Sequence, residues 1–214
     1  MPTLTTLDTP HLLALAAALG WASGFRLYAV VFLVGLSGMW GWITLPAGLS
    51  VLQHPAMLMA SGIMLFVEFF ADKIPGLDSL WDLVHSVVRI PAGALLAAGA
   101  LGADSASMTA VAALLGGTLA ATSQAAKTAT RAAINTSPDP FTNVLASLVE
   151  DGLVVGVVWL ASKHPVGFGV LLAVVVVLMW IVTRLLFKFL RAVFRRMAAF
   201  FSSTKIVEAP KELR

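Results

Sequence analysis

The chain has 214 residues, of which 59% are hydrophobic and only 12% charged, and its mean hydropathy is +0.92. An average soluble domain is about 25% charged, so this composition excludes a water-soluble globular protein of this size. Cysteine is absent, which excludes disulfides and thiolate metal sites. We therefore expect an all-α polytopic bundle of about six membrane-spanning helices.

The first predicted span runs from about residue 11 to residue 36 and contains Arg26. The preceding residues 1–10 carry an acid and no base, unlike the start of a secretory signal peptide, so we expect a short tail there and a first helix that stays in the membrane. Glycine, proline and two tryptophans between residues 37 and 53 predict an interfacial loop with aromatic anchors.

The second predicted span, residues 55–71, contains Glu68. The polar stretch 72–90 then begins with a Pro-Gly turn and continues as a helix or a re-entrant segment. We expect a helix to run on past Pro91 and to end near residue 101 as the third span, because neighbouring helices in a membrane satisfy the carbonyl that proline frees.

The last three predicted spans cover residues 107–134, 141–161 and 166–189. The fourth is rich in Gly, Ala and Thr, which permits close helix contact at the centre of the bundle and also a homodimer. Its expected place is therefore inside the bundle.

A run of basic residues without an acid among them covers the end of the last span and the segment after it. Such a run is typical of a cytoplasmic segment on anionic lipid, and its attachment to an apolar span argues against nucleic-acid binding. We expect a transmembrane bundle over residues 11–190, a basic tail over 191–214, and both termini in the cytoplasm of a bacterial inner membrane. The basic residues are Arg184, Lys188, Arg191, Arg195 and Arg196.

Eleven charged residues, five basic and six acidic, lie in or beside the predicted spans. One charge at membrane depth costs at least about 2.5 kcal/mol on insertion scales, so these groups must pair, line water or reach the headgroups. The eleven are Arg26, Glu68, Asp72, Lys73, Asp78, Asp82, Arg89, Lys127, Arg131, Glu150 and Asp151.

Helical periodicity groups most of them on four polar faces, which can meet only in a shared interior. Asp78, Asp82, His85 and Arg89 follow the spacing i, i+4, i+7, i+11. Glu150 lies about 14 Å inside its span, near the midplane where transporter sites are found. The other three faces hold Ser61, Glu68 and Asp72; Gln124, Lys127, Arg131 and Asn135; and Asn143, Ser147 and Glu150.

A weak internal similarity links the two halves of the chain. Arg26 in the first span parallels Arg131 in the fourth, and the pair Ser61 and Glu68 parallels Asn143 and Glu150, each seven residues apart. This pattern predicts a 3+3 inverted repeat, an architecture of transporters.

Three segments carry a family resemblance: SGFRLY at 23–28, EFFADKIPGLDSLWDLVHSVVRIPAGA at 68–94, and KTATRAAINTSPDPFTNVLASLVED at 127–151. Over about residues 12–162 the chain resembles the bacterial and plant membrane family catalogued as domain of unknown function 4126. The resemblance implies a polytopic membrane protein in which these charged positions matter, and it implies no activity.

The first functional hypothesis is a secondary transporter for a small anionic or phosphate-bearing substrate. An anion would bind basic and amide groups, and buried carboxyls would carry protons or pair with the bases. The expected substrate-binding residues are Arg26, Arg89, Lys127, Arg131 and Asn143. The expected proton-coupling or ion-pairing residues are Glu68, Asp72, His85, Glu150 and Asp151.

Two alternatives remain. Asp78 and Asp82 could hold Mg²⁺ or Mn²⁺ in an enzyme acting on lipid phosphates, although D-x-x-x-D on a helix is a weak motif and no nucleophile accompanies it. The charges could instead orient helices in a non-catalytic scaffold. For His85 the alternatives are a headgroup-level histidine, a proton relay, or a metal ligand with Asp78 and Asp82. The transporter needs no cofactor, and its expected partners are the bilayer and the anionic ligand.

Overall fold

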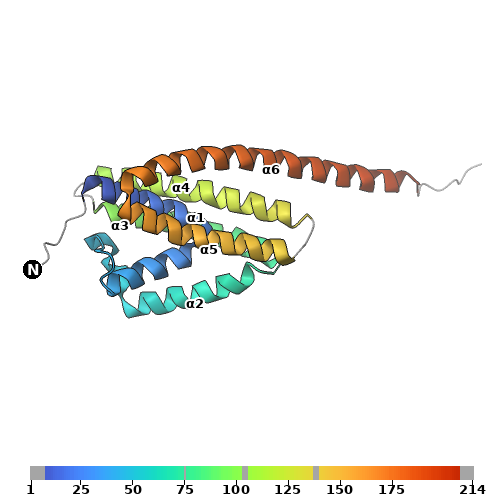
Figure 1. Ribbon diagram of the computed structural model, residues 1–214. Coiled ribbons are helices and arrows are strands. Elements are labelled where there is room, and N and C mark those ends of the chain that lie inside the picture. Colours follow the sequence, from blue (N-terminus) through green and yellow to red (C-terminus); the bar gives the residue numbers. More distant parts are fainter. Residues whose placement is uncertain (1–7, 75, 103–105, 137–139, 208–214) are drawn as a thin grey trace, which may run out of the picture.

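The computed structural model describes residues 8–74, 76–102, 106–136 and 140–207, and this part of the chain is all helical apart from its connections, as predicted. Figure 1 shows the bundle. Its elements are α1 (Thr9–Met39), the 3-10 helix η1 (Ala47–Gln53), α2 (Pro55–Ala71), α3 (Leu77–Leu101), α4 (Ala106–Ile134), α5 (Pro140–Lys163) and α6 (Pro165–Val207).

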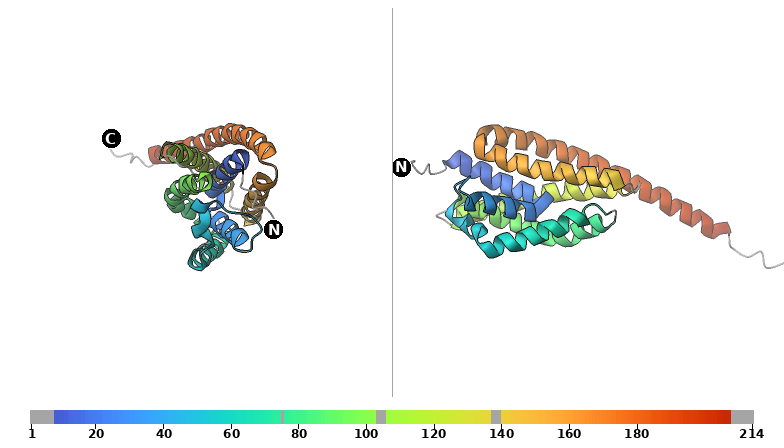
Figure 2. Two further views of the ribbon diagram at one scale, coloured as in Figure 1. Left: turned by 90° about the vertical axis from the view of Figure 1, so that its left-hand side faces the viewer. Right: turned by 60° about the horizontal axis from the view of Figure 1, so that its bottom comes forward.

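Helix α1 is broken at Arg26, where φ is −145° and ψ is 74°, outside the helical region. A straight helix of its 31 residues would be about 46 Å long. Instead, His11 near its start and Trp42 just beyond its end line the same cavity. The two halves therefore run in opposite directions, and α1 is a helical hairpin (Figures 1 and 2).

Close contacts fix where each half of the hairpin lies. Gly20 in the first half packs against Gly116 of α4, and further along the same pair of helices Ser123 Oγ donates to the Trp21 carbonyl, so these segments run side by side. Gly35 in the second half packs against Leu58 near the start of α2. The tip of the hairpin, Phe25 and Arg26, is thereby buried among α2, α4 and α5.

Five described helices are long and apolar enough to cross a membrane, or six when η1 and α2, bent by 68°, count as one span. The start of α1 and the far end of α6 lie at opposite ends of the bundle, and α6 projects well beyond it (Figure 1). Large apolar side chains such as Leu95, Leu114 and Val170 are exposed on the outer faces. This distribution fits a surface covered by acyl chains.

Three expectations can be compared with these helices. Residues 77–90 form the first half of the continuous helix α3, which runs through Pro91, so the re-entrant feature belongs to α1 rather than to segment 72–90. The inverted repeat also gains no support, because α1 folds back whereas its expected counterpart α4 is one continuous helix. The predicted boundary at residue 190 falls inside α6, which continues to Val207.

Candidate functional site

The break in α1 places the guanidinium of Arg26 at the meeting point of α1, α2 and α5. Its Nη1 lies 3.1 Å from Asp72 Oδ2, and its Nε lies 3.1 Å from Asp151 Oδ1. Its Nη2 donates to Ser147 Oγ at 2.6 Å. The Arg26 side chain is fully buried, so its charge is balanced by these carboxylates rather than by water.

The same break leaves the Phe25 carbonyl at the tip free to accept a hydrogen bond from another helix. The first half of α1 ends there, so its last carbonyls lack partners within the helix. Lys127 Nζ on α4 donates to the Phe25 carbonyl at 3.0 Å. The ammonium also lies 3.1 Å from Asp72, 3.0 Å from Asp82 and 3.3 Å from Glu150. All three donors of this buried ammonium therefore have acceptors within reach.

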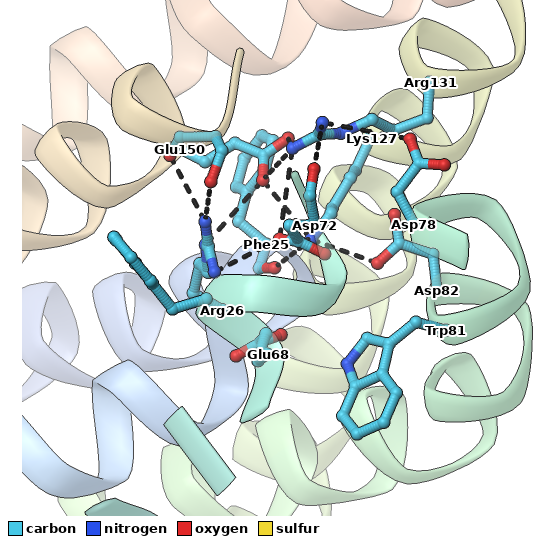
Figure 3. Close-up of polar contacts among 12 residues, drawn as sticks. Phe25, Arg26, Glu68, Asp72, Asp78, Trp81, Asp82, Lys127, Arg131 and Glu150 are labelled. Atoms are coloured by element: carbon cyan, nitrogen blue, oxygen red, sulfur yellow. Dashed lines mark hydrogen bonds and ion pairs between the residues drawn. The ribbon is translucent and has the colours of Figure 1, made fainter. Parts of the chain in front are cut away.

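Arg131, one helical turn further along α4, joins α2 and α5. Its Nη2 lies 3.1 Å from both carboxylate oxygens of Glu150. Its Nη1 donates to the Asp72 carbonyl at 3.1 Å and to Asn143 Oδ1 at 3.2 Å. Glu150 thus bridges two cations, Arg131 and Lys127, as Figure 3 shows.

Arg89 on α3 is a further buried cation, and it contacts side chains of α2, α3 and α4. Its Nη2 pairs with Glu68 of α2, and its Nη1 donates to Asp82 at 2.7 Å and to Gln124 Oε1 at 3.0 Å. Asp82 also pairs with Lys127, so it connects Arg89 to the tip of α1. We call the four buried cations and the acids that hold them the charge network: Arg26, Arg89, Lys127, Arg131, Glu68, Asp72, Asp82, Glu150 and Asp151.

Asp78 lies at the edge of the charge network. It accepts from the Gly76 backbone N–H at 2.8 Å and from Asn135 Nδ2 at 2.9 Å, and Arg131 is 3.9 Å away. In the described part of the chain, no group of three or more His, Asp or Glu side chains is arranged to hold a metal ion. Asp78 and Asp82 therefore face amides and cations rather than further carboxylates.

His85 lies outside the charge network. Its ring stacks on Trp81 with centroids 3.9 Å apart, and Nδ1 lies 2.9 Å from the Trp81 carbonyl. The structure brings the other predicted site residues together around the tip of α1. Gln124, Asn135 and Ser147 also belong to this region; periodicity placed them on the polar faces, but no role was predicted for them. The Phe25 carbonyl was missed because a backbone acceptor has no signature in side-chain type.

A groove of about 440 Å³ lies between α4, α5 and α6 and reaches the charge network. Its walls are mostly apolar, and its charged lining residues are Lys127 and Glu150. A second cavity of about 370 Å³, between α1, α2 and α5, reaches Asp151. Because Glu150 and Asp151 are adjacent on α5, this helix has a cavity on each side at the level of the charge network.

A family model described as domain of unknown function (DUF4126) matches residues 13–185, most of the chain. The chain belongs to the DUF4126 family. The resemblance of the three charged segments is therefore confirmed, and it extends through most of the apolar part of α6. No curated protein and no solved structure matches the chain.

In this DUF4126 protein, the charge network lies entirely within the matched residues and contains an excess of acid. Its four cations are fully buried, and they face five carboxylates that are at most 6% exposed, counting Asp78. Among the described residues, the buried oxygens Glu68 Oε2, Asp72 Oδ1 and Asp82 Oδ2 have no hydrogen-bond partner. Buried guanidinium nitrogens of Arg26, Arg89 and Arg131 also have no hydrogen-bond partner there, so the network holds unused donors as well as unused acceptors.

Proposed function

We propose that the protein is a proton-coupled carrier for a small anionic or phosphate-bearing substrate. The observation that carries this proposal is the position of Glu150, whose carboxylate bridges Lys127 and Arg131 at the inner end of an apolar groove. A carboxylate or phosphate of a substrate has the charge and geometry to replace that side chain on the same two cations. In the substrate-free protein, Glu150 therefore occupies the position that the substrate anion would take.

The cost of burying net charge couples the movement of the substrate anion to that of a proton. A substrate anion added to the buried network would leave a further uncompensated negative charge, which is expensive in a membrane interior. A proton taken up by Glu150 as it leaves the cations removes this cost, because one anion and one proton enter together. Release of the substrate returns the Glu150 carboxylate to Lys127 and Arg131 and frees the proton.

Helices α1 and α5 supply the moving parts in this proposal. Broken helices at the bilayer midplane are a recurrent feature of substrate sites in transporters. Cavities on both sides of α5 give this helix lateral room. A displacement of α5 would carry Glu150 and Asp151 together, away from Lys127 and Arg26 respectively.

Glutamine in place of Glu150 tests the coupling. In proteoliposomes carrying a pH-sensitive dye, an inward gradient of inorganic phosphate is expected to acidify the lumen faster than in liposomes without the protein. Glu150→Gln should slow this proton movement at least about 10-fold, because the amide cannot carry the proton. Asp8→Asn is the control and should retain most of the flux, because Asp8 is an exposed acid at the start of α1, outside the charge network.

The scaffold alternative is favoured by the pairing of every buried cation with a carboxylate. Well-folded protein that moves no proton with any anion would remove the carrier proposal and leave the scaffold. No arrangement of the described acids favours the metal-dependent enzyme.

We also infer a five-crossing topology in which α1 enters and leaves the membrane on one side. The basic face of α6 then places the C-terminal end in the bacterial cytoplasm and the start of α1 outside, unlike the expectation of two cytoplasmic termini. Because the chain lacks cysteine, Thr44→Cys and Arg195→Cys give clean probes. A membrane-impermeant maleimide should label these two thiols from opposite sides; labelling from one side contradicts the hairpin topology.

A further inference from the structure

The groove between α4, α5 and α6 is open to the lipid-facing surface of the bundle. Leu145 and Val149 of α5 line it and are still 62% and 52% exposed, and Leu178 of α6 is 54% exposed. The lining of α5 runs from Thr142 to Leu153, about 17 Å along the helix axis. An elongated apolar groove at this depth has the shape and chemistry of a hydrocarbon chain.

The inner end of the groove has the opposite chemistry. Lys127 and Glu150 stand there, 1% and 6% exposed, and Lys127 is one of the four buried cations of the charge network. A ligand that follows the groove therefore meets apolar walls first and a buried ammonium last. This sequence of environments matches an amphiphile with an anionic headgroup.

Helix α6 places basic residues just beyond the outer end of the groove. It contributes Val182 to the groove, and Arg184 follows less than one turn later, with its guanidinium 3.9 Å from the ring of Trp180. Lys188 and Arg191 continue the basic face. Basic residues next to a membrane span concentrate anionic lipids around it, so the groove opens where such lipids gather.

We propose that the groove binds the apolar chain of an anionic lipid-like amphiphile whose phosphate or carboxylate headgroup reaches Lys127 in place of Glu150. This proposal rests on the carrier function and names its substrate class. The substrate enters sideways from the bilayer instead of from water. The volume of about 440 Å³ lies within the range of about 300–1,000 Å³ that is typical of small-molecule sites.

Two substitutions on α5 separate the groove from general membrane exposure. Val149 and Leu148 are adjacent and equally exposed, at 52%, but only Val149 lines the groove. Tryptophan at position 149 fills the groove, whereas tryptophan at position 148 adds the same bulk outside it. Equal elution on size exclusion and equal thermal unfolding of the two variants establish that both are folded.

Native mass spectrometry of the protein released from neutral detergent measures binding. The probes are dodecyl phosphate, dodecanol as the chain without the anion, and inorganic phosphate as the anion without the chain. We expect dodecyl phosphate to be retained at least about 10-fold more than either of the others. Val149→Trp should reduce that retention about 10-fold or more, and Leu148→Trp should leave it within about 2-fold.

Equal retention by the two variants, or equal retention of dodecanol and dodecyl phosphate, overturns the lipid site. Tight binding of inorganic phosphate without a chain overturns it as well and identifies a water-soluble substrate, which leaves the carrier proposal standing. Dodecyl phosphate can also bind in the groove without being moved across the membrane of proteoliposomes. That result supports the lipid site and contradicts the carrier function.

Discussion

Asparagine in place of Asp72 is expected to destabilise the protein by at least about 3–5 kcal/mol, enough to prevent its recovery in folded form. Asp72 is the central acid of the charge network, with Oδ2 3.1 Å from both Arg26 and Lys127 and 3.9 Å from Arg131. Removing one charge therefore leaves three cations facing one another without this shared counter-ion. Breaking a buried pair costs much more than the pair itself contributes.

The measurement is the yield of monodisperse protein from membranes, followed by thermal unfolding in detergent. Asp151→Asn is the matched control, because Asp151 contacts the same Arg26 but its side chain is 30% exposed. Arg26 keeps its contacts with Asp72 and Ser147 in this variant, so we expect a smaller loss than for Asp72→Asn. Similar unfolding temperatures for Asp72→Asn and the original protein would show that the network contributes little to stability.

Alanine in place of Gly24 is the second large expected effect, since one methyl group at this position should disrupt the tip of α1. A Cβ atom there would lie 1.9 Å from Ser123 Oγ and 2.2 Å from the Ala120 carbonyl oxygen. The hydroxyl can rotate, but the carbonyl belongs to the backbone of α4, so the hairpin itself must move. Overpacking of this kind costs about 1–3 kcal/mol or more.

The loss should appear both as lower stability and as lower anion-dependent proton flux, because the tip carries Arg26 and the Phe25 carbonyl. Gly152→Ala on α5 is the control: its Cβ would meet no atom within 4 Å, and alanine favours a helix by about 1 kcal/mol relative to glycine. A Gly24→Ala protein as stable as Gly152→Ala would contradict the close packing of α1 on α4.

Much of the architecture could be predicted from local sequence. The bounds of α2 and the end of α3 near Leu101 follow from apolar length, turn residues and the Pro-Gly step, which are properties of short segments. The convergence of Glu68, Asp72, Asp82, Arg89, Lys127, Arg131 and Glu150 follows from helical periodicity and from the cost of charge in lipid. Both constraints apply however the helices are arranged, so they predict this convergence from the sequence alone.

The reversal of α1 was decided only by tertiary structure. Its apolar run is continuous across Arg26, and hydropathy does not record a change of φ and ψ at one residue. Contacts from distant parts of the chain stabilise the break: Lys127 bonds to the Phe25 carbonyl, and Ser123 to the Trp21 carbonyl. The groove beside Glu150 has the same origin, because the spacing between α4, α5 and α6 depends on how three separate helices pack. Composition and periodicity determined which residues are buried, and packing decided which of them meet.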